Sequence, residues 1–243
     1  MAIRVTVWNE FTHEKNDPEA RAQYPDGIHV AVRDFLSVDS GLTIRTATLD
    51  QPACGLPDEV LFDTDVLVWW GHMRHADVDD ATVERIRRRV YAGMGFVALH
   101  SAHHSKPFRA ILGTTGNLTW GREQKALVWN LAPTHPIAAG LPSHFELFEE
   151  MYGEPFFIPR PDDVIFGTWY EDGNLFRGGC TWTCGLGRVF YFHPGHETCA
   201  SFHHPLVQEI IRRGVRWAAP APLDPSLSNT CVHQIEAPAS TQK

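Results

Sequence analysis

The chain has 243 residues, of which 43% are hydrophobic and 21% charged, and this balance excludes a disordered or fibrous protein. Its 29 acidic and 21 basic residues give a net charge of -8, so nucleic acid is not an expected partner. The five cysteines are scattered and the N-terminus lacks a signal-peptide pattern, so we expect a cytoplasmic protein. No apolar run is long enough to suggest a membrane span.

Runs of aliphatic, β-branched and aromatic residues predict strands along most of the chain. They cover, in order, Ile3–Trp8, Leu42–Leu49, Asp65–Trp70, Gly95–His100, Ala126–Leu131, Val164–Tyr170 and Arg188–Phe192. Asp65–Trp70 and Gly95–His100 are apolar almost throughout, as expected for strands that are covered on both faces of a parallel sheet.

Helical patterns lie between these strands. One helix is expected over Ile28–Phe35. Apolar residues at three- and four-residue steps indicate a second helix over Val83–Val90, ended by Gly93, and a third over Val207–Val215. The alternation of strands and helices predicts an α/β fold with a doubly wound, mostly parallel sheet of the flavodoxin-like kind.

Two parts of the chain depart from this alternation. From residue 145 to residue 186 the pattern changes to aromatic-rich strands with turn signals at Glu171–Gly173 and Gly185–Gly187, which predicts an antiparallel extension of the same domain. The end of the chain is rich in proline and polar residues. We therefore predict one α/β domain over residues 1–219 and an extended or disordered tail, dispensable for chemistry, over residues 220–243.

Histidines follow four of the predicted strands, close to the point where each strand ends. The candidate metal ligands among them are His13, His72, His100 and His196. Because the carboxyl ends of parallel strands meet at one edge of a sheet, these side chains should converge. Imidazoles with a carboxylate suit a divalent metal such as zinc or manganese. Without a metal, the same groups could act as general acids and bases, and both chemistries remain open.

A second concentration of carboxylates lies beside aromatic residues in the segment Phe148–Glu154. Glu150 and Tyr152 share one face if this segment is a strand, and an acidic strand edge is the alternative. The substrate-binding side chains that we expect from this segment and from the strand ends are Asn9, Glu10, Trp70, Tyr152, Glu154 and Glu197.

The sequence also limits the choice of cofactor and ligand. No Gly-x-Gly-x-x-Gly turn follows the first strand and no P-loop is present, so we expect no nucleotide cofactor. Tryptophan faces suit stacking on sugar rings, although core packing is their usual role. The tryptophans considered for stacking are Trp8, Trp69, Trp70, Trp120, Trp169 and Trp182.

With these residues in place, the chain resembles the ThuA-like family of trehalose utilisation and, through it, the class I glutamine amidotransferase fold. The motifs that carry the resemblance span residues 3–219 and include Trp70-Gly71-His72, Gly93 to Ser101, His135-Pro136-Ile137, Glu149 to Tyr152 and Pro194 to Glu197. The resemblance implies sugar metabolism, with trehalose-related disaccharides handled as keto-sugars that a partner dehydrogenase produces. It also implies His100, Glu150 and His196 as catalytic residues.

The turn after the central strand differs from that of the amidotransferases, which carry a cysteine nucleophile there. Here the turn reads Leu99-His100-Ser101-Ala102, so glutamine hydrolysis by a thiolate is not expected. Ser101 with His196 as base is a weak alternative, because no Gly-x-Ser-x-Gly elbow surrounds it. We expect His100 to face the crevice, so that His100→Ala abolishes activity and changes stability by no more than about 1 kcal/mol.

Two functions of different classes follow. The leading hypothesis is an enzyme that removes a proton next to the carbonyl of a sugar or keto-sugar, leading to isomerisation, elimination or hydrolysis. Glu150 or His196 would be the base, and His72 and His100 would polarise oxygen or hold a metal. The alternative is a non-catalytic carbohydrate-binding or regulatory protein. Expected partners are a sugar, a sugar dehydrogenase of the same pathway and further copies of the chain in a homo-oligomer.

Overall fold

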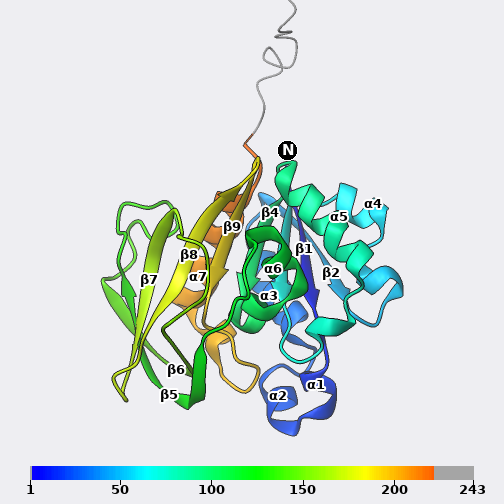
Figure 1. Ribbon diagram of the computed structural model, residues 1–243. Helices are drawn as coiled ribbons and strands as arrows, with labels where there is room; N and C mark the ends of the chain where they lie inside the picture. The colour runs from blue at the N-terminus through cyan, green and yellow to red at the C-terminus, as the bar shows by residue number, and fades with distance from the viewer. Residues whose placement is uncertain (1, 222–243) are drawn as a thin grey trace, which may run out of the picture.

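The computed structural model describes residues 2–221, which fold around one nine-stranded sheet (Figure 1). The strands are β1 (Ile3–Asn9), β2 (Leu42–Thr48), β3 (Val66–Trp70), β4 (Gly95–Leu99), β5 (Thr119–Asn130), β6 (His144–Gly153), β7 (Asp163–Tyr170), β8 (Leu175–Cys184) and β9 (Gly187–Phe192). The α-helices are α1 (His13–Asn16), α2 (Pro18–Gln23), α3 (Ile28–Leu36), α4 (Asp58–Phe62), α5 (Asp80–Tyr91), α6 (Lys106–Leu112) and α7 (Pro205–Ala218). Short 3-10 helices are η1 (Pro52–Gly55), η2 (His75–Asp77), η3 (His100–His104) and η4 (Ser201–His203).

The sheet has a parallel half and an antiparallel half. Its strand order is β2-β1-β3-β4-β9-β8-β7-β5-β6. Neighbours from β2 to β9 run parallel, and neighbours from β9 to β6 run antiparallel, so β9 belongs to both halves. The parallel half has the strand order of flavodoxin-like sheets. The predicted fold class, including its antiparallel extension, is confirmed.

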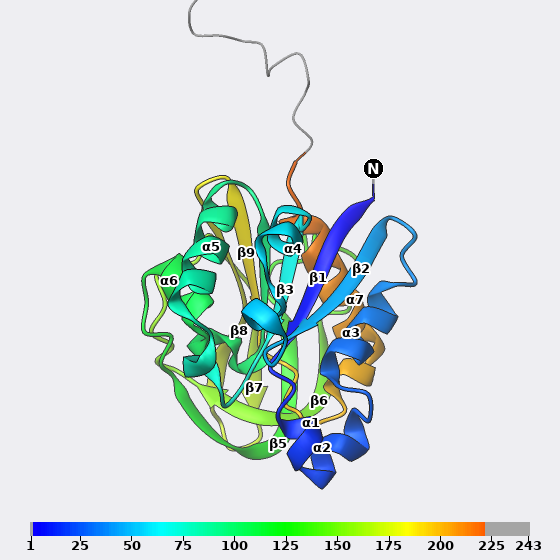
Figure 2. The ribbon, with the colours of Figure 1, turned by 90° about the vertical axis from the view of Figure 1, so that its right-hand side faces the viewer.

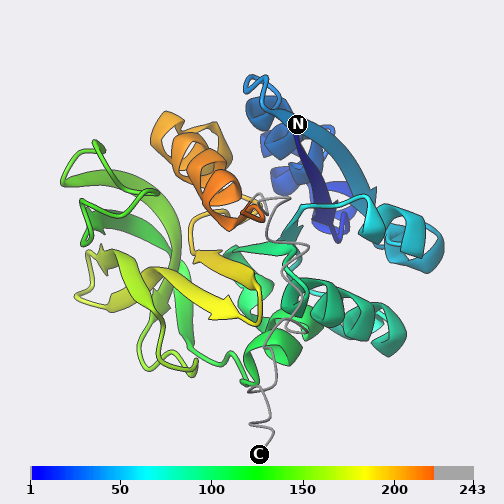
Figure 3. The same cartoon turned by 90° about the horizontal axis from the view of Figure 1, so that it is seen from above.

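Helices cover both faces of the parallel half, as the view from above shows (Figure 3). α3 and α7 pack on one face, and α5 and α6 on the other. The apolar stripe of α5 buries Val83, Ile86 and Val90 against the sheet, and the side chain of Asp79 caps its first turn by accepting the Thr82 N–H. None of the helices in the described part of the chain is long and apolar enough to cross a membrane.

The antiparallel half is larger than the sequence predicted. It starts at Thr119 rather than near Phe145, and the predicted strand Ala126–Leu131 is only the second part of β5. The first part of β5 is polar and mostly exposed, so it lacks the apolar run that marks a buried strand. The predicted turns do connect β7 to β8 and β8 to β9.

The parallel strands all end at the same edge of the sheet. In Figure 2, β1 and β2 start at the top, near the N-terminus, and run down towards α1 and α2. β3, β4 and β9 run in the same direction. The loops that follow β1, β3, β4 and β9 therefore meet below the sheet. Of the predicted tail, residues 222–243 lie outside the described residues.

Candidate functional site

Side chains from four loops and one strand meet beyond the carboxyl ends of the parallel strands. Their nitrogen and oxygen atoms form three groups, each with its ligand atoms within 4.8 Å of one another. These groups are His13, His72 and Glu197; His72, Glu150 and His196; and His100, His196 and Glu197. We call the six residues the histidine–glutamate cluster. The structure thus brings together all four predicted metal ligands and all three predicted catalytic residues, and their roles stay predictions.

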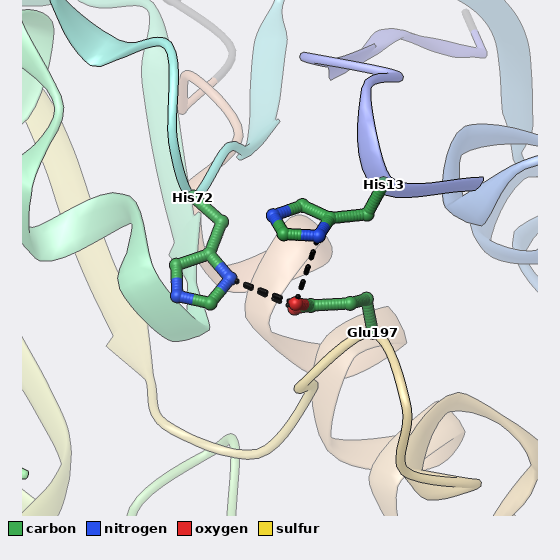
Figure 4. Close-up of side chains that lie close together, drawn as sticks. All are labelled: His13, His72 and Glu197. Atoms are coloured by element: carbon green, nitrogen blue, oxygen red, sulfur yellow. Dashed lines mark hydrogen bonds and ion pairs between the residues drawn. The ribbon is translucent and has the colours of Figure 1, made fainter. Parts of the chain in front are cut away.

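Glu197 lies between two imidazoles, as Figure 4 shows. Its Oε1 is 3.1 Å from His13 Nδ1, and its Oε2 is 2.9 Å from His72 Nδ1. A third imidazole nitrogen, His196 Nε2, is 3.6 Å from Glu197 Oε1. Burial alone would raise the pKa of Glu197, but the hydrogen bond with His72 and the nearby imidazoles lower it to about 2. Glu197 is therefore an anion at neutral pH.

His100 and Glu150 form a second buried pair in the cluster. His100 Nε2 is 3.1 Å from Glu150 Oε2, and His100 Nδ1 donates to the carbonyl oxygen of His193 at 3.0 Å. Burial would lower the pKa of His100, but the Glu150 carboxylate raises it above its ordinary value. Burial would likewise raise the pKa of Glu150, and His100 lowers it instead. The pair is best described as an imidazolium beside a carboxylate.

The expectation that His100 faces an open crevice is wrong. Its side chain is fully buried and lies against β6 and the segment after β9. Its φ of +52° falls in the left-handed region, which a residue other than glycine adopts at a cost. The small stability change that we expected for His100→Ala does not follow from this geometry.

Glu10 holds the loop that carries His72. Its buried carboxylate accepts the backbone N–H groups of His72, Met73 and Arg74 at 2.8 to 3.0 Å. These bonds use both carboxylate oxygens and fix the turn after β3. Glu10 therefore positions the His72 loop, and its predicted substrate-binding role stays a prediction.

Glu149 holds the loop that carries His196 in place. The sequence analysis did not predict this role for Glu149. Its carboxylate, fully buried, accepts the N–H groups of Gly195 and His196 at 2.7 and 3.1 Å and the Ser201 hydroxyl at 2.6 Å. The signal that could have found it is the doubled glutamate at positions 149 and 150, because two adjacent buried carboxylates need two separate sets of partners.

Three more predicted substrate-binding residues have hydrogen-bond or ion-pair partners within the protein, and their predicted role stays a prediction. The amide of Asn9 is buried and hydrogen-bonded within the chain. Trp70 is also buried, and its indole N–H donates to the Gly195 carbonyl oxygen at 2.9 Å. Glu154 pairs with Arg177 at 2.7 Å and belongs to none of the three groups. Local sequence patterns mark such residues as polar or aromatic strand ends but do not reveal which partners satisfy them.

The turn after β4 contains no activated nucleophile. The Ser101 hydroxyl donates to the Gly71 carbonyl oxygen at 2.6 Å and is buried. His196, its suggested base, instead has Nδ1 2.8 Å from the Thr198 hydroxyl. A serine nucleophile would need a base within hydrogen-bond reach. The arrangement therefore does not support Ser101 as a nucleophile with His196 as its base.

A cavity of about 220 Å³ opens beside the cluster. It is lined by His72, His75, Ser101, His103, His104, Leu118, Trp120, Glu150 and Tyr152. Tyr152 stacks on His100 with ring centroids 5.1 Å apart, and burial raises the pKa of its phenol so that it stays neutral. A larger cavity of about 780 Å³, beside β6 and η4, reaches no cluster residue. The smaller cavity is therefore the better candidate for a substrate.

The cluster has the donors and the spacing that a divalent metal needs. Within the described part of the chain, one buried polar atom of the cluster, His13 Nε2, makes no hydrogen bond. Tetrahedral zinc with bonds of about 2.0–2.1 Å holds its ligand atoms about 3.4 Å apart, close to the 2.9, 3.1 and 3.6 Å that separate Glu197 from its three imidazoles. The best-fitting set is His13, His72 and Glu197, with His196 beside it. His100 fits less well than predicted, because both of its nitrogens already have partners.

Buried neutral histidines beside the cluster should make the protein less stable in mild acid. Burial lowers the pKa of His103 and of His193 well below the usual value, whereas both take up protons near about pH 6.5 in the unfolded chain. The unfolded state then binds more protons than the folded state. The free energy of unfolding therefore decreases as the pH is lowered, by up to about 1.4 kcal/mol per pH unit for each histidine. His100 opposes this trend, because its raised pKa adds stability at low pH that is lost as the pH rises.

Urea unfolding of the metal-free protein between about pH 7.5 and about pH 5.5 measures this slope. His103→Gln removes one of the buried histidines whose pKa is lowered and should flatten the profile. The glutamine amide can still donate to the Gly116 carbonyl oxygen that His103 Nδ1 contacts at 2.6 Å. An unchanged slope in this variant would contradict the assignment.

Comparisons with solved structures agree with this fold. A ThuA-like protein from Parabacteroides merdae is 16% identical, with a TM-score of 0.69, over 93% of this chain and 94% of that one. A ThuA-like protein from Bacteroides uniformis is 17% identical, with a TM-score of 0.62, over 89% of this chain and 91% of that one. A glutamine amidotransferase from Thermotoga maritima is 12% identical, with a TM-score of 0.57, over 90% and 98% of the two chains.

At these identities the similarity concerns the fold alone. A search of curated proteins finds no match. The model of one protein family, ThuA, described as trehalose utilisation, matches residues 4–218, which is nearly the whole described part of the chain. On that match, and in agreement with the motifs and the sheet order, the chain belongs to the ThuA family.

Proposed function

We propose that this protein is an enzyme that removes a proton from the carbon next to the carbonyl group of a sugar or keto-sugar, with the help of a divalent metal. The observation that carries the proposal is the convergence of four imidazoles and two carboxylates beside a cavity. The description of the family as trehalose utilisation supports a carbohydrate as the substrate class.

His13, His72 and Glu197, with His196 beside them, are the residues that would hold the metal. Zinc or manganese bound there would supply Lewis-acid polarisation of the substrate's carbonyl oxygen. Glu10 keeps the His72 loop in place through three backbone N–H groups. This arrangement leaves the remaining cluster residues, His100 and Glu150, free for proton transfer.

Glu150 is the residue best placed to accept the proton. It lines the cavity, and its Oε2 is 3.1 Å from His100 Nε2. His100 lowers the pKa of Glu150, so the side chain is a carboxylate and can act as a base at neutral pH. The C–H proton would pass to Glu150 and the electron pair of that bond would move towards the carbonyl oxygen. Return of the proton to a neighbouring carbon gives isomerisation, and loss of a leaving group gives elimination.

Hydrogen exchange tests this proposal without knowledge of the final product. The protein is stripped with a chelator, loaded with zinc or manganese and mixed in D₂O with a keto derivative of trehalose. We expect about one metal ion per chain by elemental analysis, and loss of the proton signal next to the carbonyl faster than in buffer. Glu150→Gln should keep the metal and lose the exchange. Sugar binding without metal or exchange would instead support a non-catalytic carbohydrate-binding protein.

A further inference from the structure

Two adjoining cavities lie in front of the histidine–glutamate cluster. The inner cavity is the 220 Å³ space that reaches Glu150 and His72. The outer cavity, of about 450 Å³, is lined by His75, Ala76, His104, Lys106, Arg109 and Asn117. His75 and His104 line both, with ring centroids 6.3 Å apart. The two cavities therefore meet at this pair of imidazoles.

The inner cavity has a polar wall at the cluster and an aromatic wall on the antiparallel half. Trp120 of β5 is 72% exposed and pairs across the strands with Tyr152 of β6. Tyr152 is buried against His100, so the two aromatic residues mark the mouth and the inner end of one wall. An indole face left this exposed beside a cavity can stack on the apolar face of a sugar ring.

The outer cavity offers hydrogen-bond donors, and no carboxylate from residues 2–221 lines it. The Arg109 guanidinium makes no hydrogen bond or ion pair with the residues that the structure describes, and it lines this cavity. Lys106 is paired with Asp80 and donates to the Val78 carbonyl oxygen at 2.6 Å, so its charge is already compensated. One unpaired guanidinium beside the amide of Asn117 suits hydroxyl groups better than a doubly charged phosphate, which needs several cations.

We propose that the two cavities are two subsites for one glycoside. The reacting ring lies in the inner cavity, stacked on Trp120, and a second neutral, hydroxyl-rich group lies in the outer cavity against Arg109 and Asn117. The choice of the inner ring as the reacting one rests on the proposed function. Trp120 thus binds any sugar that enters, and Arg109 selects substrates with two rings over single sugars.

Calorimetric titration of the full-length, metal-loaded protein with trehalose, glucose and glucose 6-phosphate tests this assignment. We expect trehalose to bind at least about tenfold more tightly than glucose. Arg109→Ala should reduce trehalose affinity to that of glucose and leave glucose unchanged, and Trp120→Ala should weaken both by about tenfold. Trp129→Ala is the matched control, because Trp129 lies on the same strand, is 37% exposed and lines neither cavity. It should change neither affinity.

Three results would overturn the two-subsite assignment. They are trehalose and glucose affinities within about twofold of each other, a preference for glucose 6-phosphate that Arg109→Ala removes, and no sugar binding at all. Thermal melts check that each variant folds, and Asn117→Ala replaces Arg109→Ala if the latter does not. Metal loading and hydrogen exchange are measured separately, so a failure of the proposed function is distinguished from a failure of the subsites.

Discussion

Glu197→Gln is expected to lower the affinity for zinc by at least about a hundredfold and to remove activity with it. Glu197 is the carboxylate closest to His13, His72 and His196, at 3.1, 2.9 and 3.6 Å. Glutamine has the shape of glutamate but no negative charge. Its NH₂ group is a hydrogen-bond donor and would face the imidazole nitrogens in place of an accepting carboxylate oxygen. Competition with a chromophoric chelator measures the affinity.

Glu123→Gln is the matched control for this experiment. Glu123 Oε1 lies 3.5 Å from His196 Nδ1, on the other side of that ring, and Glu123 belongs to none of the three ligand groups. Its replacement should change zinc affinity by no more than about threefold. Equal zinc binding by Glu197→Gln and the unmodified protein would remove Glu197 from the metal site.

His100→Ala is expected to destabilise the protein by about 3 kcal/mol as well as to inactivate it, because it leaves the Glu150 carboxylate without its charged partner. The Glu150 side chain is only 10% exposed, so water compensates little of this loss. The double variant His100→Ala/Glu150→Ala also removes the unpaired carboxylate. It should recover about 1–2 kcal/mol of the stability that His100→Ala loses. Urea unfolding of the single and double variants at neutral pH closes this double-mutant cycle.

A loss of less than about 1 kcal/mol in His100→Ala would show that the buried ion pair does not form. Additive effects of the two single variants would lead to the same conclusion, since residues in direct contact should show an interaction energy. Retained hydrogen exchange in His100→Ala would show that Glu150 works as a base without the imidazolium.

The sequence alone determined the parallel half of the sheet and the edge at which the site lies. Strands such as Val66–Trp70 and Gly95–Leu99 are buried along their whole length, and this burial demands the apolar runs that the sequence displays. Once the strands are parallel, their carboxyl ends share one edge, so the convergence of His13, His72 and His196 follows from topology. The family resemblance rests on the same residues, because they are spaced by the strands that carry them.

Only the tertiary structure decided what each polar residue at that edge does. Glu10 and Glu197 both follow strand ends, yet one binds three backbone N–H groups and the other faces three imidazoles. The partners come from loops far away in the chain, and local patterns do not encode them. Likewise, Glu150 meets His100 only because β6 folds back towards the turn after β4, and the polar, exposed strand β5 that positions β6 has little hydrophobic signal.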